Sequence, residues 1–140
     1  MRESLVRLWI AWATRVAELV QRAEQWGKEL GWSTRRIVKK LYDSRLGDHP
    51  EPALLLQEDT CRALLEPIGR SAPGVEGVVD LYVMPAYDDI ASLYYYDGRW
   101  NLHYLRPDHS TAASVREAAG EPLSKEALRG VLEEMKKHAA

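Results

Sequence analysis

The longest regular pattern of hydrophobic positions covers residues 3–30 and predicts an N-terminal helix. Its apolar residues are separated alternately by four and three positions, which places them along one side of a helix. They are Leu5, Trp9, Trp12, Val16, Leu19, Ala23, Trp26 and Leu30. Flanking apolar residues widen this stripe, so we expect the helix to lie on a sheet or in a bundle rather than in a two-stranded coiled coil. The alternative is a helix shared across a subunit interface, with Trp9 and Trp12 contacting the partner.

A second helix is predicted over residues 35–46, with Ser33 or Thr34 as its N-terminal cap. We expect Ile37 and Val38 to face inward and the basic residues to spread around the opposite side. These basic residues are Arg35, Arg36, Lys39, Lys40 and Arg45.

The middle of the chain has weaker patterns. Residues 53–57 form a short apolar run that predicts a buried strand. A helix is expected to begin at Asp59 and to bend or end early at Pro67. Cys61 lies on the apolar side of that helix and is interpreted as a buried space-filling residue, since a single cysteine can form no disulfide within the chain.

Three strands are predicted over residues 78–84, 90–96 and 99–105. Asp97-Gly98 between the second and third is a strong signal for a two-residue β-turn, because both positions need a positive φ. That turn sets the pairing of the two strands and therefore which side chains share a face. The core face carries Leu93, Tyr95, Trp100, Leu102 and Tyr104. The opposite face carries Ser92, Tyr94, Tyr96, Arg99, Asn101 and His103.

The C-terminal region predicts a short helix near residues 112–119 and a better-marked final helix. Ser124 is the expected N-cap of that final helix. Its apolar stripe consists of Leu128, Val131, Leu132 and Met135. The whole chain, residues 1–140, is therefore predicted to be a single α+β domain. We expect an antiparallel sheet of three to four strands packed against the long N-terminal helix and the C-terminal helix.

Charge divides this domain into two segments. Residues 1–47 have a net charge of +5 and residues 48–140 a net charge of −7, although the whole chain carries only −2. The basic segment could bind an acidic partner, or the two segments could attract each other within the fold or between subunits.

The sequence gives little support to an enzyme. It has no nucleophile elbow, no phosphate-binding loop, no dinucleotide-binding motif and no H-E-x-x-H, so we expect neither a cofactor nor a metal. The strongest acidic group is Asp80 with Asp88 and Asp89, which makes a small metal-dependent hydrolase or nuclease one alternative. A general acid–base site around His103, with Tyr94 or Asp80, is a further alternative.

A nucleic-acid-binding accessory protein is another alternative. The five basic residues of the predicted helix 35–45 could contact phosphates, and two adjacent helices are similar in arrangement to a helix-turn-helix. A charge run on a helix is, however, most often a solvated face.

The leading hypothesis is a non-enzymatic protein-interaction module that self-associates or is a small subunit of a larger assembly. The residues expected to contact the partner have the side-chain types enriched at protein interfaces. They are Tyr94, Tyr96, Arg99, Asn101, His103, Trp9 and Trp12. Arg7 and Arg15 interrupt the N-terminal apolar run, so we expect no membrane association and a cytoplasmic protein.

Overall fold

The computed structural model describes residues 2–43, 47–69, 77–85, 88–104 and 120–139. In this part of the chain it contains two helices and one antiparallel sheet of seven strands, which lie in the sheet in the order of the sequence. The elements are α1 (Arg2–Glu29), β1 (Ser33–Asp43), β2 (Gly47–Glu58), β3 (Cys61–Gly69), β4 (Gly77–Val83), β5 (Asp88–Tyr96), β6 (Arg99–Tyr104), β7 (Gly120–Pro122) and α2 (Lys125–Ala139). The predicted α+β class is confirmed, while the predicted number of three to four strands is too low.

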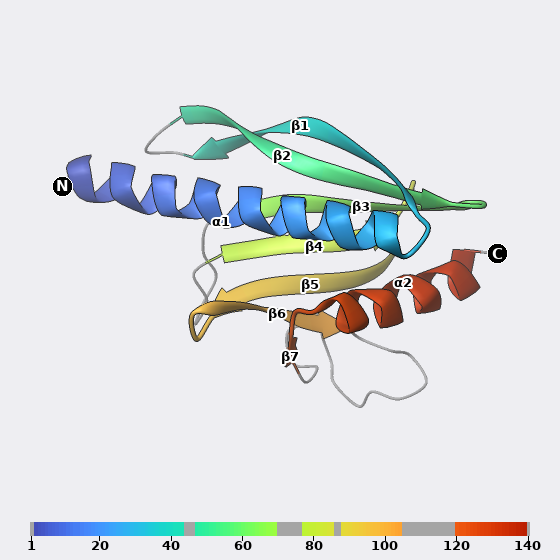
Figure 1. Cartoon of the computed structure of the whole chain (residues 1–140). Helices are drawn as coiled ribbons and strands as arrows, with labels where there is room; N and C mark the ends of the chain where they lie inside the picture. The colour runs from blue at the N-terminus through green and yellow to red at the C-terminus, as the bar shows by residue number, and fades with distance from the viewer. Residues whose placement is uncertain (1, 44–46, 70–76, 86–87, 105–119, 140) are drawn as a thin grey trace.

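Both helices pack on the same face of the sheet (Figure 1). Alternate residues of each strand point to that face, and together with the inner side of each helix they form one hydrophobic core. The fully buried side chains include Val16 and Leu19 from α1, Leu54 from β2, Leu81 from β4 and Leu132 from α2. The prediction that the long N-terminal helix lies on a sheet is therefore confirmed.

The predicted second helix is wrong, because the residues from 33 to 43 form the strand β1. β1 is paired with β2 along its whole length, from Ser33 opposite Gln57 to Asp43 opposite Gly47. Ile37 and Val38 are β-branched and suit a strand as well as a helix. The ladder with β2 decides between the two, and the sequence pattern of a single short segment does not contain that information.

The helix predicted to start at Asp59 is also wrong, since Cys61–Gly69 forms β3. Leu64 and Leu65 are neighbours on a strand, so their side chains point to opposite faces of the sheet. Both are buried, because β3 lies inside the sheet. Pro67 lies where the pairing between β3 and β4 shifts by one residue, a position at which a strand tolerates proline. The short helix predicted at residues 112–119 lies outside the described residues.

The turn at Asp97-Gly98 and the pairing that it sets are confirmed. Asp97 has φ 55° and Gly98 has φ 72°, and Tyr96 lies opposite Arg99, Leu93 opposite Leu102 and Ser92 opposite His103. The predicted N-cap is also confirmed, because the Ser124 hydroxyl accepts a hydrogen bond of 3.0 Å from the Ala127 amide.

Replacing Gly98 with alanine is expected to lower the free energy of unfolding by about 1–2 kcal/mol, since a Cβ atom strains the left-handed conformation. Urea unfolding followed by circular dichroism measures this loss. The Asp97→Asn variant is the control and should be close to wild type, because asparagine accepts this conformation readily. Equal stability of the Gly98→Ala variant and the wild type would contradict the turn.

Candidate functional site

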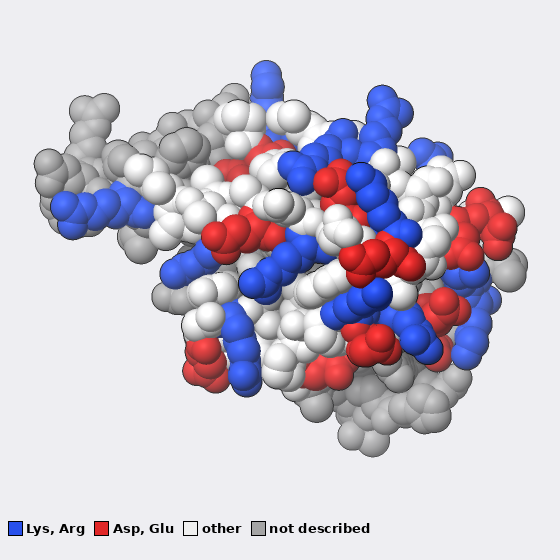
Figure 2. Space-filling view, viewed as in Figure 1, with Lys and Arg blue, Asp and Glu red and all other residues white. Residues whose placement is uncertain are grey.

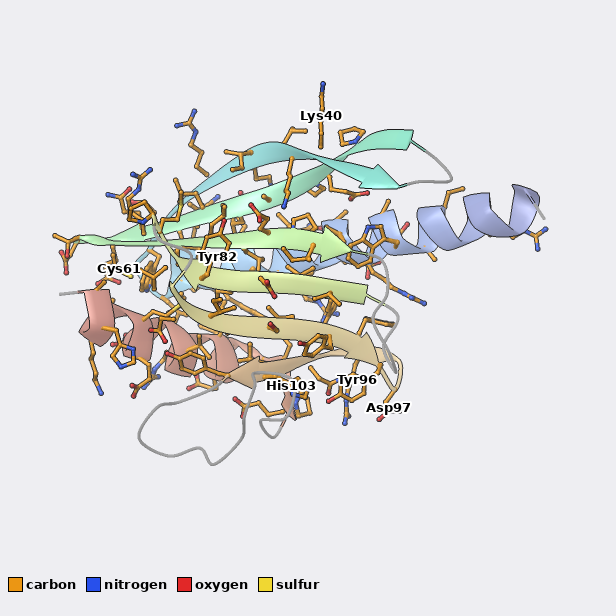
Figure 3. All side chains as sticks on the ribbon, turned by 180° about the vertical axis from the view of Figure 1, so that it is seen from behind. Lys40, Cys61, Tyr82, Tyr96, Asp97 and His103 are labelled. Carbon is orange, nitrogen blue, oxygen red and sulfur yellow. The ribbon has the colours of Figure 1, made fainter. Side chains whose placement is uncertain are left out.

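The polar side chains of the β5–β6 hairpin form a compact network on the sheet face opposite the helices. The Tyr96 hydroxyl and the His103 Nε2 atom are 2.9 Å apart and share a hydrogen bond. The Tyr94 ring contacts the same imidazole edge-on, with 5.0 Å between the ring centroids. Figure 3 shows Tyr96 and His103 side by side, toward the β7 end of the sheet.

Asn101 connects this network to the end of the hairpin. Its Nδ2 atom donates hydrogen bonds of 3.1 Å to the carbonyl oxygens of Tyr96 and Arg99. Its Oδ1 atom accepts a longer bond of 3.4 Å from Arg99 Nε. Asn101 is buried, and these bonds hold the hairpin end in place.

The predicted contact residues of the hairpin lie on the expected face, but three of the five are buried. The exposed fraction is 8% for Tyr94, 3% for Asn101 and 7% for His103. β7 runs beside His103, and a Cβ atom on Gly120 would lie 2.5 Å from His103 Nε2. The open tyrosine-rich surface that the sequence predicts is therefore not present. Arg99 is exposed and Tyr96 is half-buried.

The two tryptophans predicted to contact a partner lie in α1. Trp12 is only 2% exposed and packs in the core against Trp100, with 6.3 Å between the ring centroids. Its place in the core leaves it unavailable to a partner of the folded chain. The side chain of Trp9 is outside the described part of the structure.

The acidic residues considered for a metal site have protein partners. Asp80 is buried and accepts a hydrogen bond of 2.8 Å from the Ser92 hydroxyl. Asp89 accepts one of 2.7 Å from the Tyr104 hydroxyl and lies 2.7 Å from His138 Nδ1. The Asp88 side chain is outside the described residues. Among the described side chains, no three His, Cys, Asp or Glu residues are placed to share a metal ion.

The basic residues predicted to form a nucleic-acid-binding helix lie instead on β1. Arg36 donates two hydrogen bonds to Glu24 of α1, and this guanidinium lowers the pKa of the Glu24 carboxyl. Lys39 forms an ion pair of 2.8 Å with Glu66 of β3. Arg35 and Lys40 are exposed, and Lys40 projects away from the sheet at its β1 edge (Figure 3). Arg45 is outside the described residues.

β1 also exposes two large apolar side chains, so the prediction that they face inward is wrong. Ile37 is 38% exposed and Val38 is 74% exposed. They are neighbours on a strand, so they point to opposite faces of the sheet. β1 is the end strand in the sheet order, and within the described part of the chain it pairs with β2 alone. The sequence of residues 35–40 places the two apolar residues next to each other between pairs of basic residues, and this pattern by itself fits a strand and a helix equally well.

A small cavity of about 230 Å³ lies on the helix side of the hairpin. Its lining is both apolar and charged, with Leu19, Tyr95, Trp100 and Leu123 beside Glu18, Arg22 and Arg99. The Arg15 guanidinium lies 4.2 Å from the centroid of the Tyr95 ring, so this cation already interacts with an aromatic face beside the cavity.

Cys61 is 2% exposed at the start of β3, and this burial raises the pKa of its thiol. We expect iodoacetamide at pH 8 to alkylate the folded chain about tenfold or more slowly than the urea-unfolded chain, because the reactive thiolate is both rare and covered. Mass spectrometry over a time course measures both rates. Equal rates would show that Cys61 is accessible in the folded chain.

No described helix is long and apolar enough to cross a membrane. No protein-family model matches the chain, and neither the curated proteins nor the solved structures contain a significant match.

Proposed function

We propose that this chain is a non-enzymatic protein-interaction module that self-associates or serves as a small subunit of a larger assembly. The observation that supports this proposal most directly is the edge strand β1, which exposes Ile37 and Val38 beside a row of main-chain groups. Sheets with long apolar edges pair readily with other strands, and such an edge is usually covered or interrupted. In the described structure the exposed apolar pair lies at the middle of an eleven-residue strand.

The polar groups on the sheet face opposite the helices are bonded to one another and serve the fold. The Tyr96–His103 bond, the Ser92–Asp80 bond and the hydrogen bonds of Asn101 connect side chains to their neighbours within the sheet. Groups held in this way stabilise the fold on its second face.

The proposal is tested by purifying the full-length chain from the cell that makes it and measuring its mass by light scattering over a concentration series. We expect a species heavier than the 15.9 kDa monomer, either a homo-oligomer or a stoichiometric complex. A monomer at every concentration, with no stoichiometric partner, would overturn the proposal.

A pair of matched variants tests whether the assembly forms through β1. Val38→Lys removes the exposed apolar side chain from the edge strand, whereas Ile68→Lys makes the same change on the interior strand β3, where Ile68 is 42% exposed. We expect the first variant to weaken the assembly and the second to leave it intact.

A further inference from the structure

The outer side of β1 has the dimensions that an added strand requires, and no other strand of the described residues pairs with it. β1 is longer than a typical strand, and its pairing with β2 is continuous over eleven residue pairs. That continuous ladder keeps the strand extended, so its outer N–H and C=O groups form a regular row. A regular row of this kind can pair with an extended peptide by strand addition.

The side chains of β1 repeat the same order on both faces of the sheet. On the face of the helices the order is Arg36, Val38, Lys40, and the ion pair of Arg36 with Glu24 of α1 fixes this assignment. On the other face the order is Arg35, Ile37, Lys39. Each face therefore presents one exposed apolar residue between two cations.

Basic side chains also gather along the margin of the molecule where β1 lies (Figure 2). Arg35 and Lys40 are exposed there, and the side chain of Arg36, although paired with Glu24, is still 48% exposed. The edge therefore has a positive potential that would attract an acidic segment and repel a basic one.

This charge pattern argues against a second copy of the chain as the occupant. Two copies of β1 paired antiparallel with Val38 opposite Val38 would place Arg36 opposite Lys40. With Ile37 opposite Ile37, Arg35 would instead face Lys39. Like charges directly opposite each other on paired strands are destabilising.

A nucleic acid uses this edge less well than a peptide does. Arg36 and Lys39 are already paired with Glu24 and Glu66. Ile37 and Val38 lie between the cations, where a phosphate backbone has no apolar group to offer. An extended peptide with two apolar residues between two pairs of acidic residues places an apolar residue between two acidic ones on each face, and so satisfies the main-chain row, the apolar pair and the charges together.

Building on the proposed function, we infer that β1 is the docking edge for an extended acidic segment of a partner protein, which adds to the sheet as an eighth strand. The added strand would place its acidic residues beside Arg35 and Lys40 and its apolar residues beside Ile37 and Val38.

The test uses the full-length chain and a short fluorescent peptide built on the order Glu-Glu-Val-Val-Glu-Glu, with binding followed by fluorescence anisotropy. We expect this peptide to bind and its counterpart with lysine in place of glutamate not to bind. The Arg35→Glu/Lys40→Glu variant is expected to weaken binding about tenfold or more, because attractive pairs become repulsive ones. Glu126→Lys/Arg129→Glu, which exchanges an exposed ion pair on α2, is the control and should bind normally.

Peptides N-methylated at alternate residues separate strand addition from simple charge attraction. Methylation of one set blocks the hydrogen bonds to β1, while methylation of the other set leaves them intact. We expect one of the two methylated peptides to lose binding. Equal binding of both, or no binding of the unmodified acidic peptide, would overturn the inference.

Two further outcomes would also overturn it. The first is tighter binding of a poly-uridine RNA or a DNA duplex to the same residues. The second is a homodimer that Val38→Lys dissociates, since the occupant of the edge would then be a second copy. If such a homodimer is found, the proposed interaction function survives while the acidic-strand inference fails. The same holds if light scattering shows an assembly that no β1 variant disturbs.

Discussion

Replacing Trp12 with alanine is expected to lower the free energy of unfolding by about 3–5 kcal/mol. The indole is 2% exposed and lies between α1 and the sheet, beside Trp100 and over Gly77 of β4. Its removal leaves a cavity where the helix meets the sheet, and such a cavity closes only in part. Urea unfolding followed by far-ultraviolet circular dichroism measures the loss without depending on tryptophan fluorescence.

The control for Trp12 is another apolar residue of the same helix. Ile10 is 52% exposed, so Ile10→Ala should change the stability by no more than about 0.5 kcal/mol. A loss below about 1 kcal/mol for Trp12→Ala would show that the indole is not a core residue. Trp12 would then again be available as a contact for a partner.

Replacing Gly77 with alanine is expected to lower the free energy of unfolding by about 1–3 kcal/mol, because the new methyl group would overlap the six-membered ring of Trp12. The close approach of α1 to β4 depends on the absence of a side chain at this position. The same unfolding measurement determines the loss.

The Gly77→Ala substitution in the Trp12→Ala background provides the decisive comparison. The alanine at position 12 leaves room for the new methyl group, so the cost of Gly77→Ala should largely disappear. The coupling energy between the two sites is then about 1–3 kcal/mol, within the range measured for residues in contact. An equal cost in both backgrounds would show that Trp12 does not limit the side chain at position 77.

These two experiments concern the fold, whereas the proposed interaction depends on β1. The separation is useful, since Val38 and Lys40 are exposed and their substitution should leave the core unchanged. A loss of partner binding in β1 variants that unfold like the wild type would therefore report on the edge itself.

For the predicted contact residues of the hairpin, the sequence predicts the face of the sheet on which each side chain lies, but not whether that side chain is exposed. The turn at Asp97-Gly98 fixes the register locally, and this register determines that Tyr94 and His103 point away from the helices. Their burial depends on the rest of the sheet and on β7, whose Gly120 lies against His103. Burial of this kind comes from segments distant in sequence.

Local sequence signals were sufficient to predict the two helices and the hairpin. The stripe of α1, the Ser124 cap of α2 and the Asp97-Gly98 turn are local signals, and each acts within a few residues of the chain. The confirmed α+β class follows from them, as does the packing of a wide apolar stripe on a sheet.

The strands β1 and β3, in contrast, depend on pairing between segments that are distant in the sequence. Short runs with adjacent apolar residues, such as Ile37-Val38 and Leu64-Leu65, satisfy a helix and a strand equally well. Pairing with β2 and β4 stabilises the strand conformation over the helix. These hydrogen bonds join different segments, so the sequence of one segment does not reveal them. The position of β1 at the end of the sheet exposed Ile37 and Val38, and it turned a predicted packing surface into the candidate interaction edge.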